Sequence, residues 1–200
     1  MPEGTPERVA PPPPLVRFAR LAVRAFAALA LAVGLTLCAA TGPTEYQVKA
    51  ALLFNLVKFT EWPSSAFTNA AAPLIFGVVG EDPFGPVLDE VVKGESINKR
   101  PLLVKRFKLG EDLSMCHVLF VSRSEKERLA TLLATLKDKP VLTLGDPDRF
   151  CEQGGMINLV LSANGTVKPD INPDAARAAG LQISSKLLSL RMVRLVKTEP

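Results

Sequence analysis

Histidine, cysteine and aromatic residues are scarce in this sequence. Its 200 residues include 1 histidine and 3 cysteines, and phenylalanine, tryptophan and tyrosine together make up 6%. A single histidine excludes a metal site that is built on two histidines. The sequence also lacks the patterns of a nucleophile elbow, a zinc site or a base-stacking surface. We therefore expect a protein that is not an enzyme and that needs no metal and no cofactor.

A strong excess of one charge is also missing. The formal net charge is +4, from 24 basic and 20 acidic residues, and the basic residues are scattered. A protein that follows a phosphate backbone needs a concentrated basic surface, so we expect no nucleic-acid partner. The hydrophobic share of 48% and the length of 200 residues predict one globular domain with its own core.

The apolar run at residues 25–37 is too short for the roughly 20 residues of a membrane-spanning helix. Basic residues precede this run, and the small residues 38–40 follow it. This order is typical of a secretory signal peptide, and an uncleaved anchor is the alternative. We predict a signal peptide at residues 1–40, of which residues 1–16 are a disordered extension. The basic residues before the run are Arg17, Arg20 and Arg24.

Apolar periodicity divides the rest of the chain into alternating helices and strands. Residues 44–59 predict a helix with an apolar stripe and Thr44 as its cap. The predicted strands are 73–80, 102–107, 117–121, 141–144, 156–161 and 166–171, and further helices begin near 83, 122 and 172. This alternation predicts an α/β fold with a mostly parallel sheet and flanking helices. Asn164-Gly165 predicts an antiparallel hairpin near the C-terminus.

The helix after residue 122 has the clearest pattern in the chain. Four leucines repeat with the spacing of one helical face, at Leu129, Leu132, Leu133 and Leu136. A capping box at its start is offered either by Ser122 with Glu125 or by Ser124 with Glu127.

Gly80 and Gly85 stand where a phosphate-binding loop follows a strand. Such a loop needs a lysine and a hydroxyl after the second glycine, but Pro86 and Val87 occupy those positions. We therefore interpret the segment as a tight turn between a strand and a helix.

The strand ends supply a candidate ligand crevice, because open α/β sheets bind ligands beyond the carboxyl ends of their strands. We predict that it is formed by Glu81, Asp82, Ser122 and Arg123. No spacing singles out a pair of catalytic carboxylates. The carboxylate pairs that we expect to be solvated or to cap helices are Glu81/Asp82, Asp89/Glu90, Glu111/Asp112 and Asp146/Asp148.

His117 and Cys116 are neighbours at the start of a predicted strand. Adjacent side chains of a strand point to opposite faces, so this imidazole cannot activate this thiol. We expect a capped or partly buried histidine.

Five segments taken together resemble the YfiR-like family. They are residues 45–63, 77–85, 116–122, 154–158 and 171–188, and they run in the order of the family across 43–196. The first and last segments are specific, whereas the glycine turn alone is not. The resemblance implies a periplasmic domain at 43–196, with a Rossmann-like sheet, without known catalytic activity and often dimeric.

The resemblance also implies a signalling role through a membrane partner. Characterised members repress an inner-membrane diguanylate cyclase, and an outer-membrane lipoprotein can sequester them. Release of the cyclase raises cyclic di-GMP and favours biofilm. Other members are expected to serve other receptors or sensor kinases, so the cyclase is one of two partner classes.

In the family, the docking surface lies partly on the helices after the last strand. The matching positions are Pro173, Ala176, Ile183, Ser185 and Leu188. Three of them are smaller or more polar than a tight apolar docking pocket requires. Ordinary core packing is the alternative for Ile183 and Leu188.

The cysteines depart from those family members that contain two disulfides. Cys116 matches one cysteine of the first pair and Cys151 one of the second, and Asn158 stands where the second pair has its other cysteine. In a sheet with the strand order 2-1-3-4-5, the strands near Cys116 and Cys151 are roughly 10 Å apart. We therefore predict that these two cysteines are unpaired.

Three functions remain in competition. The first is a regulatory protein that docks on a membrane partner. The second is a periplasmic small-molecule sensor or solute-binding module that uses the strand-end crevice and feeds a receptor or histidine kinase. The third is a periplasmic hydrolase.

Overall fold

The computed structural model describes residues 42–108 and 110–199, and the predicted signal peptide lies outside them. Residues 43–200 form one compact unit with its own core. The helices are α2 (Glu45–Val57), α3 (Pro86–Val92), α4 (Leu129–Thr135), α5 (Pro173–Ala178) and α6 (Ser185–Leu188). Three 3-10 helices are η1 (Ser64–Ala66), η2 (Leu113–Met115) and η3 (Arg123–Arg128). None of the described helices is long and apolar enough to cross a membrane.

The strands form one large sheet and one short ladder. They are β1 (Thr60–Glu61), β2 (Leu74–Val79), β3 (Ser96–Ile97), β4 (Arg100–Phe107), β5 (Val118–Val121), β6 (Leu142–Gly145), β7 (Ile157–Leu161), β8 (Val167–Ile171), β9 (Gln182–Ile183) and β10 (Arg194–Leu195). The large sheet has the order β10-β8-β7-β6-β5-β2-β4-β3, and β1 pairs with β9 separately.

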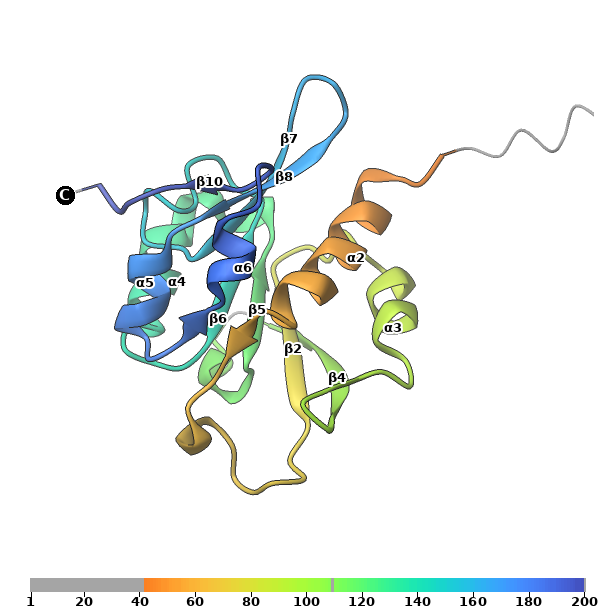
Figure 1. The fold of residues 1–200 in the computed structure, drawn as a ribbon, viewed down its shortest axis with the longest axis vertical. Helices are drawn as coiled ribbons and strands as arrows, with labels where there is room; N and C mark the ends of the chain where they lie inside the picture. The colour runs from red at the N-terminus through yellow and green to blue at the C-terminus, as the bar shows by residue number, and fades with distance from the viewer. Residues whose placement is uncertain (1–41, 109, 200) are drawn as a thin grey trace, which may run out of the picture. The chain divides into compact units, whose positions relative to one another are not determined.

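The predicted α/β class and strand order are confirmed. Strands β4, β2, β5, β6 and β7 are mutually parallel along the sheet, which is the order 2-1-3-4-5. Strand β8 runs antiparallel to β7 through the predicted hairpin, in which Gly165 has a φ of 77°. Figure 1 shows this hairpin as the light-blue pair.

Both faces of the sheet are covered, because side chains alternate along each central strand. Phe76 and Phe120 belong to a core that includes α2, α3, α5 and α6. Val79 and Val121 belong to a second core that includes residues of α4. The two cores make a layered structure with the sheet in the middle (Figure 1).

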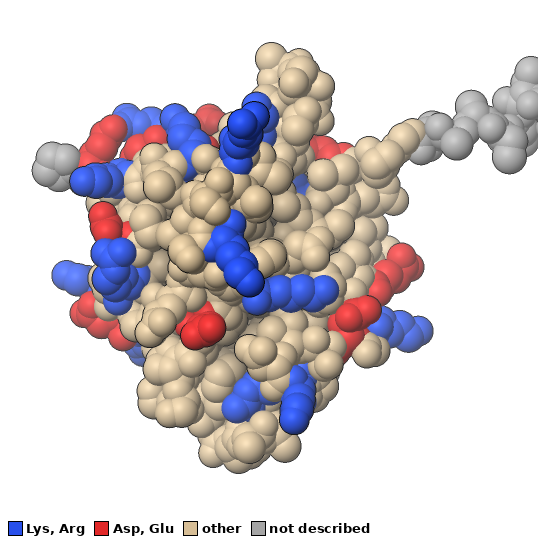
Figure 2. All heavy atoms as spheres, viewed as in Figure 1, with Lys and Arg blue, Asp and Glu red and all other residues tan. Residues whose placement is uncertain are grey.

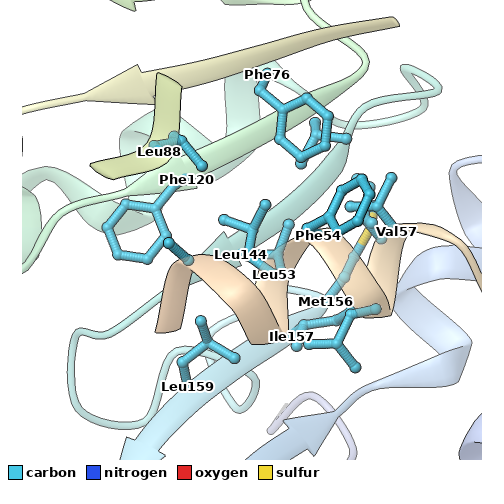
Figure 3. Packing of buried hydrophobic residues seen from close by; sticks show 14 of the residues in the cluster. Leu53, Phe54, Val57, Phe76, Leu88, Phe120, Leu144, Met156, Ile157 and Leu159 are labelled. Atoms are coloured by element: carbon cyan, nitrogen blue, oxygen red, sulfur yellow. The ribbon is translucent and has the colours of Figure 1, made fainter. Parts of the chain in front are cut away.

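Helix α2 anchors the larger core. The Thr44 hydroxyl accepts a hydrogen bond from the Gln47 N–H, and the Gln47 side-chain oxygen accepts one from the Thr44 N–H, which completes a capping box. Figure 3 shows Leu53, Phe54 and Val57 of α2 facing the side chains of the sheet. Full burial of one such side chain contributes about 1.5–3 kcal/mol.

The start of the helix after residue 122 differs from the prediction. Residues 123–128 form a 3-10 helix, and Leu129 begins the α-helix. The Ser122 hydroxyl accepts from the Ser124 N–H, and the Ser124 hydroxyl accepts from Glu81 instead of capping the helix. Neither capping box forms, because these hydroxyls have other donors.

Candidate functional site

The four residues of the predicted crevice line one pocket beyond the carboxyl ends of the parallel strands. Its volume is about 680 Å³, and Glu81, Asp82, Ser122 and Arg123 all contribute to its wall. Strand β2 has β4 on one side and β5 on the other. The pocket therefore lies at the topological switch point, where the connections after β2 and β5 diverge.

The backbone after β2 is shaped by its contact with η3. Gly80 has a φ of +90°, and a Cβ there would lie 2.5 Å from the Ser124 hydroxyl oxygen. That hydroxyl accepts a hydrogen bond of 2.9 Å from the Glu81 N–H. Only glycine permits the turn after β2 to come this close to η3. The contact holds the wall at Glu81 against the wall at Ser124.

Asp82 is committed to the fold. Its Oδ1 accepts a 2.8 Å hydrogen bond from the Phe84 N–H, and its Oδ2 accepts a 2.9 Å bond from Nε of Arg106. Arg106 also binds Asp89 at 2.8 Å, and this hydrogen bond holds the pKa of the Asp89 carboxyl below its usual range. Asp82 therefore orders the rim of the pocket and is not a free acid or base.

Arg123 is also held by the protein. Its guanidinium donates to the backbone oxygen of Asp146 from Nη2 at 3.1 Å and from Nε at 3.3 Å. This contact joins the loop after β5 to the loop after β6. Of the four predicted residues, Glu81 is the one whose side chain has neither a hydrogen bond nor an ion pair in the described part of the chain.

Beside this pocket lies a buried charge cluster that the sequence analysis missed. Lys49 is 0% exposed and Asp146 is 3% exposed. Nζ of Lys49 lies 3.0 Å from Oδ2 of Asp146 and 2.6 Å from Oε1 of Glu45. The expectation that Asp146 is solvated is thus wrong, because α2 delivers a buried ammonium group to its carboxylate.

Tyr46 completes the cluster and also lines the pocket. Its hydroxyl donates a 2.7 Å hydrogen bond to Oδ2 of Asp146. Burial, and then this hydrogen bond, raise the pKa of the Tyr46 hydroxyl, so it remains a donor. The other carboxylate oxygen, Oδ1 of Asp146, has no hydrogen-bond partner among the described residues, and the same holds for Oδ1 of the buried Asn158.

His117 lies at the opposite ends of the strands, and the prediction of a capped or partly buried ring is confirmed. Nδ1 accepts a 3.1 Å hydrogen bond from the Ile75 N–H, and Nε2 lies 3.1 Å from the Ala66 oxygen. The ring also stacks on Phe67 with a centroid distance of 4.4 Å. Burial lowers the pKa of His117, so the ring is neutral, with its proton on Nε2.

The two cysteines of the described chain are buried free thiols. Sγ of Cys116 lies 3.0 Å from the Leu113 oxygen, and Sγ of Cys151 lies 3.3 Å from the Asp170 oxygen. Burial raises the pKa of each thiol to about 12, so neither is a nucleophile near neutral pH. That they stay unpaired in the exported protein remains a prediction, which thiol labelling and intact mass without reductant test.

The predicted docking residues are spread over α5, β9 and α6. Ser185 is exposed, Ile183 and Leu188 are half-buried against the larger core, and Pro173 is half-buried at the first turn of α5. Ala176 is 1% exposed and contributes almost nothing to the surface. A docking surface made from this set therefore consists of the other four residues. The segment that follows adds larger exposed apolar side chains, at Leu190, Met192 and Leu195.

This face of the molecule suits contact with another protein better than chemistry. Figure 2 shows that its middle, over α2 and α6, is largely uncharged and that the charged side chains there are mainly basic. Among residues 42–108 and 110–199, no three histidine, cysteine or acidic side chains come together as a metal site would require. Of the acids that line the switch-point pocket, Asp82 is held by hydrogen bonds, and neither buried thiol lines that pocket.

The chain was compared with known protein families and with curated proteins. The model of a family described as YfiR/HmsC-like matches residues 46–191 of the chain. No curated protein matches it.

Proposed function

Because the chain belongs to the YfiR/HmsC-like family, we propose that it is a periplasmic regulator that binds a membrane-embedded signalling protein. The partner is a diguanylate cyclase, which the protein represses, so that cyclic di-GMP and biofilm formation stay low. A sensor kinase is the other partner class. An outer-membrane lipoprotein that sequesters the regulator would release the cyclase.

The observation that carries this proposal is the match of nearly the whole described domain to one family, residues 46–191. The exposure of large apolar side chains supports a docking role for the C-terminal apolar segment, which we define as residues 183–195. Leu190 is 45% exposed, Met192 40% and Leu195 56%, and they follow one another closely along the chain. Large apolar side chains that gather on a surface commonly mark a contact with another protein.

The test is a crosslinking pulldown from membranes with tagged protein of residues 43–200, followed by identification of what is captured. We expect a diguanylate cyclase or a sensor kinase with a periplasmic loop. A doubly changed protein, Leu190→Asp with Met192→Asp, should capture at least about tenfold less, because a charge in the centre of an apolar contact is desolvated without a partner.

The matched control is Leu103→Asp, which places the same charge on an apolar residue that is 53% exposed on β4. It should capture the partner as well as the unchanged protein does. Equal losses in the control and the double variant would contradict docking through the C-terminal apolar segment. Capture of nothing under conditions that preserve weak complexes would overturn the regulatory role itself.

A second function, small-molecule sensing, is favoured by one observation. All four crevice residues that the sequence predicted line a single pocket at the switch point of the sheet. A regulator could receive its input there. The experiment is a thermal-shift screen of small polar metabolites, with Glu81→Gln as the variant that should lose the shift.

A further inference from the structure

A second pocket lies on the opposite face of the sheet from α2. Its volume is about 440 Å³, within the range of small-molecule sites. Residues of the smaller core form its apolar wall: Val79 at the end of β2, with Leu132 and Leu136. Leu113 of η2 closes one side.

Three acidic residues line the pocket: the exposed Glu111 and Asp112, and Glu125, which is the least exposed of the three. Glu125, in η3, is 7% exposed and lines the pocket. Its Oε1 lies beside the backbone of Gly80, at 3.1 Å from where a Cβ would stand. Its carboxylate has no ion pair among the residues that the structure describes, and its oxygens are not fully buried, unlike Oδ1 of Asp146.

The cations nearby do not neutralise this carboxylate. Lys108 and Arg128 line the same pocket, but both are exposed, and neither lies within ion-pair distance of Glu125. Exposed cations are strongly hydrated and hold an anion weakly. A carboxylate that lines a largely apolar pocket and has no ion pair within the chain is instead a strong acceptor for a cation that enters the pocket.

We infer that this pocket binds a small organic cation, an ammonium group on a short hydrocarbon or aromatic body. The ammonium group donates hydrogen bonds to Glu125, and the apolar body packs on Leu132 and Leu136. Glu125 repels an anion of the same shape, and a neutral analogue leaves the carboxylate unpaired. This site is separate from both the switch-point pocket and the C-terminal apolar segment.

The test uses phenethylammonium as the probe and titrates it into protein of residues 43–200 while methyl NMR signals of the leucines are recorded. Shifts confined to Leu132, Leu136 and Leu113 are expected. Glu125→Gln should weaken binding about 10- to 100-fold, because the hydrogen bond loses its charge. Thr131→Trp should abolish binding, because the indole fills space at a residue that lines the pocket.

Glu127→Gln is the matched control, since Glu127 lies in the same 3-10 helix with a side chain that is 84% exposed. It should change binding by less than about twofold, as expected for a solvated charge. The neutral analogue 2-phenylethanol should bind at least about tenfold more weakly than the cation. Thermal unfolding of each variant verifies that it is folded.

Three results would overturn the inference. The first is no binding of the cation at millimolar concentration to the unchanged protein. The second is equal loss in Glu125→Gln and Glu127→Gln, which would indicate general surface charge. The third is a double-mutant cycle of Glu125→Gln with Arg128→Ala that shows strong coupling in stability, because the carboxylate would then be paired within the chain.

Discussion

Two buried carboxylates lie beyond the carboxyl ends of the parallel strands, and they differ in their partners. Asp146 accepts hydrogen bonds from Lys49 and Tyr46 of α2. Glu125, on the other face of the sheet, has no partner for its side chain among the described residues. The residues are exposed to similar extents, 3% and 7%, although only Asp146 has a fully buried oxygen without a partner. The exposure of the residue therefore does not separate their roles. The partners do: the fold neutralises the charge of Asp146 and leaves that of Glu125 for something else.

The largest effect should come from breaking the neutralised pair. Lys49→Met leaves the Asp146 carboxylate buried without its cation, and the free energy of unfolding should fall by about 3–5 kcal/mol. Urea denaturation measures this fall. The double variant Lys49→Met with Asp146→Leu should recover most of the loss, because no charge then remains buried. Lys93→Met, at an exposed position, is the control and should change stability by less than about 0.5 kcal/mol. If Lys49→Met also lowered the free energy of unfolding by less than about 0.5 kcal/mol, the pair of Lys49 and Asp146 would not stabilise the fold.

The next largest effect tests the turn at Gly80, which packs against Ser124 and Glu125 of η3. Gly80→Ala puts a Cβ 2.5 Å from the Ser124 hydroxyl oxygen at a φ of +90°. Strain and steric conflict together should lower the free energy of unfolding by about 2–4 kcal/mol. Gly154→Ala is the matched control, because φ is +99° there and nothing lies within 4 Å of the new Cβ.

Gly154→Ala should lower the free energy of unfolding by only about 1 kcal/mol, because it strains the backbone but creates no steric conflict. Thermal or urea unfolding of both variants gives the difference. If Gly154→Ala cost as much as Gly80→Ala, the contact of the turn with η3 would contribute nothing.

The arrangement of the sheet could be predicted from the sequence, but its short ladders could not. Alternating strands and helices predicted the parallel order, and Asn164-Gly165 predicted the hairpin, because both signals are local. Strands β1, β9 and β10 have 2 residues each, which is too short for an alternating pattern to be recognised. Their pairing depends on where distant parts of the chain are placed by the core.

The site was predictable only in part for the same reason. The switch-point rule located the crevice, since it needs only the strand order. The pair of Lys49 and Asp146 joins residues 97 positions apart, and nothing near Asp146 in the sequence announces a buried partner. One signal was available: Lys49 lies on the side of α2 that buries Ala50, Leu53 and Leu56, where a lysine needs a counter-charge.

A third buried titratable group, His117, should make stability depend on pH. The folded protein lowers the pKa of this ring, whereas the unfolded chain takes up the proton near 6.5. The free energy of unfolding should therefore fall as the pH drops below 6.5, until the pH reaches the lower folded value. His117→Gln should remove this part of the slope, as urea denaturation between pH 7.5 and about 5 would show. Identical slopes in both proteins would mean that the ring does not titrate with folding.

The smallest effect on stability should come from the carboxylate without a partner, and it should have the opposite sign from the first. Glu125→Gln keeps the shape of the side chain and removes a buried charge that nothing in the described chain compensates. The free energy of unfolding should rise by up to about 1 kcal/mol, because no ion pair is lost and the partial desolvation of the charge is relieved. Urea denaturation beside Asp146→Asn gives the contrast directly, since that change removes the buried one of the two acid partners of Lys49, leaves only the partly exposed Glu45 and should cost several times more. If Glu125→Gln lowered the free energy of unfolding by about 2 kcal/mol or more, the Glu125 carboxylate would stabilise the fold as that of Asp146 does. The reason to treat Glu125 as a binding group would then be gone.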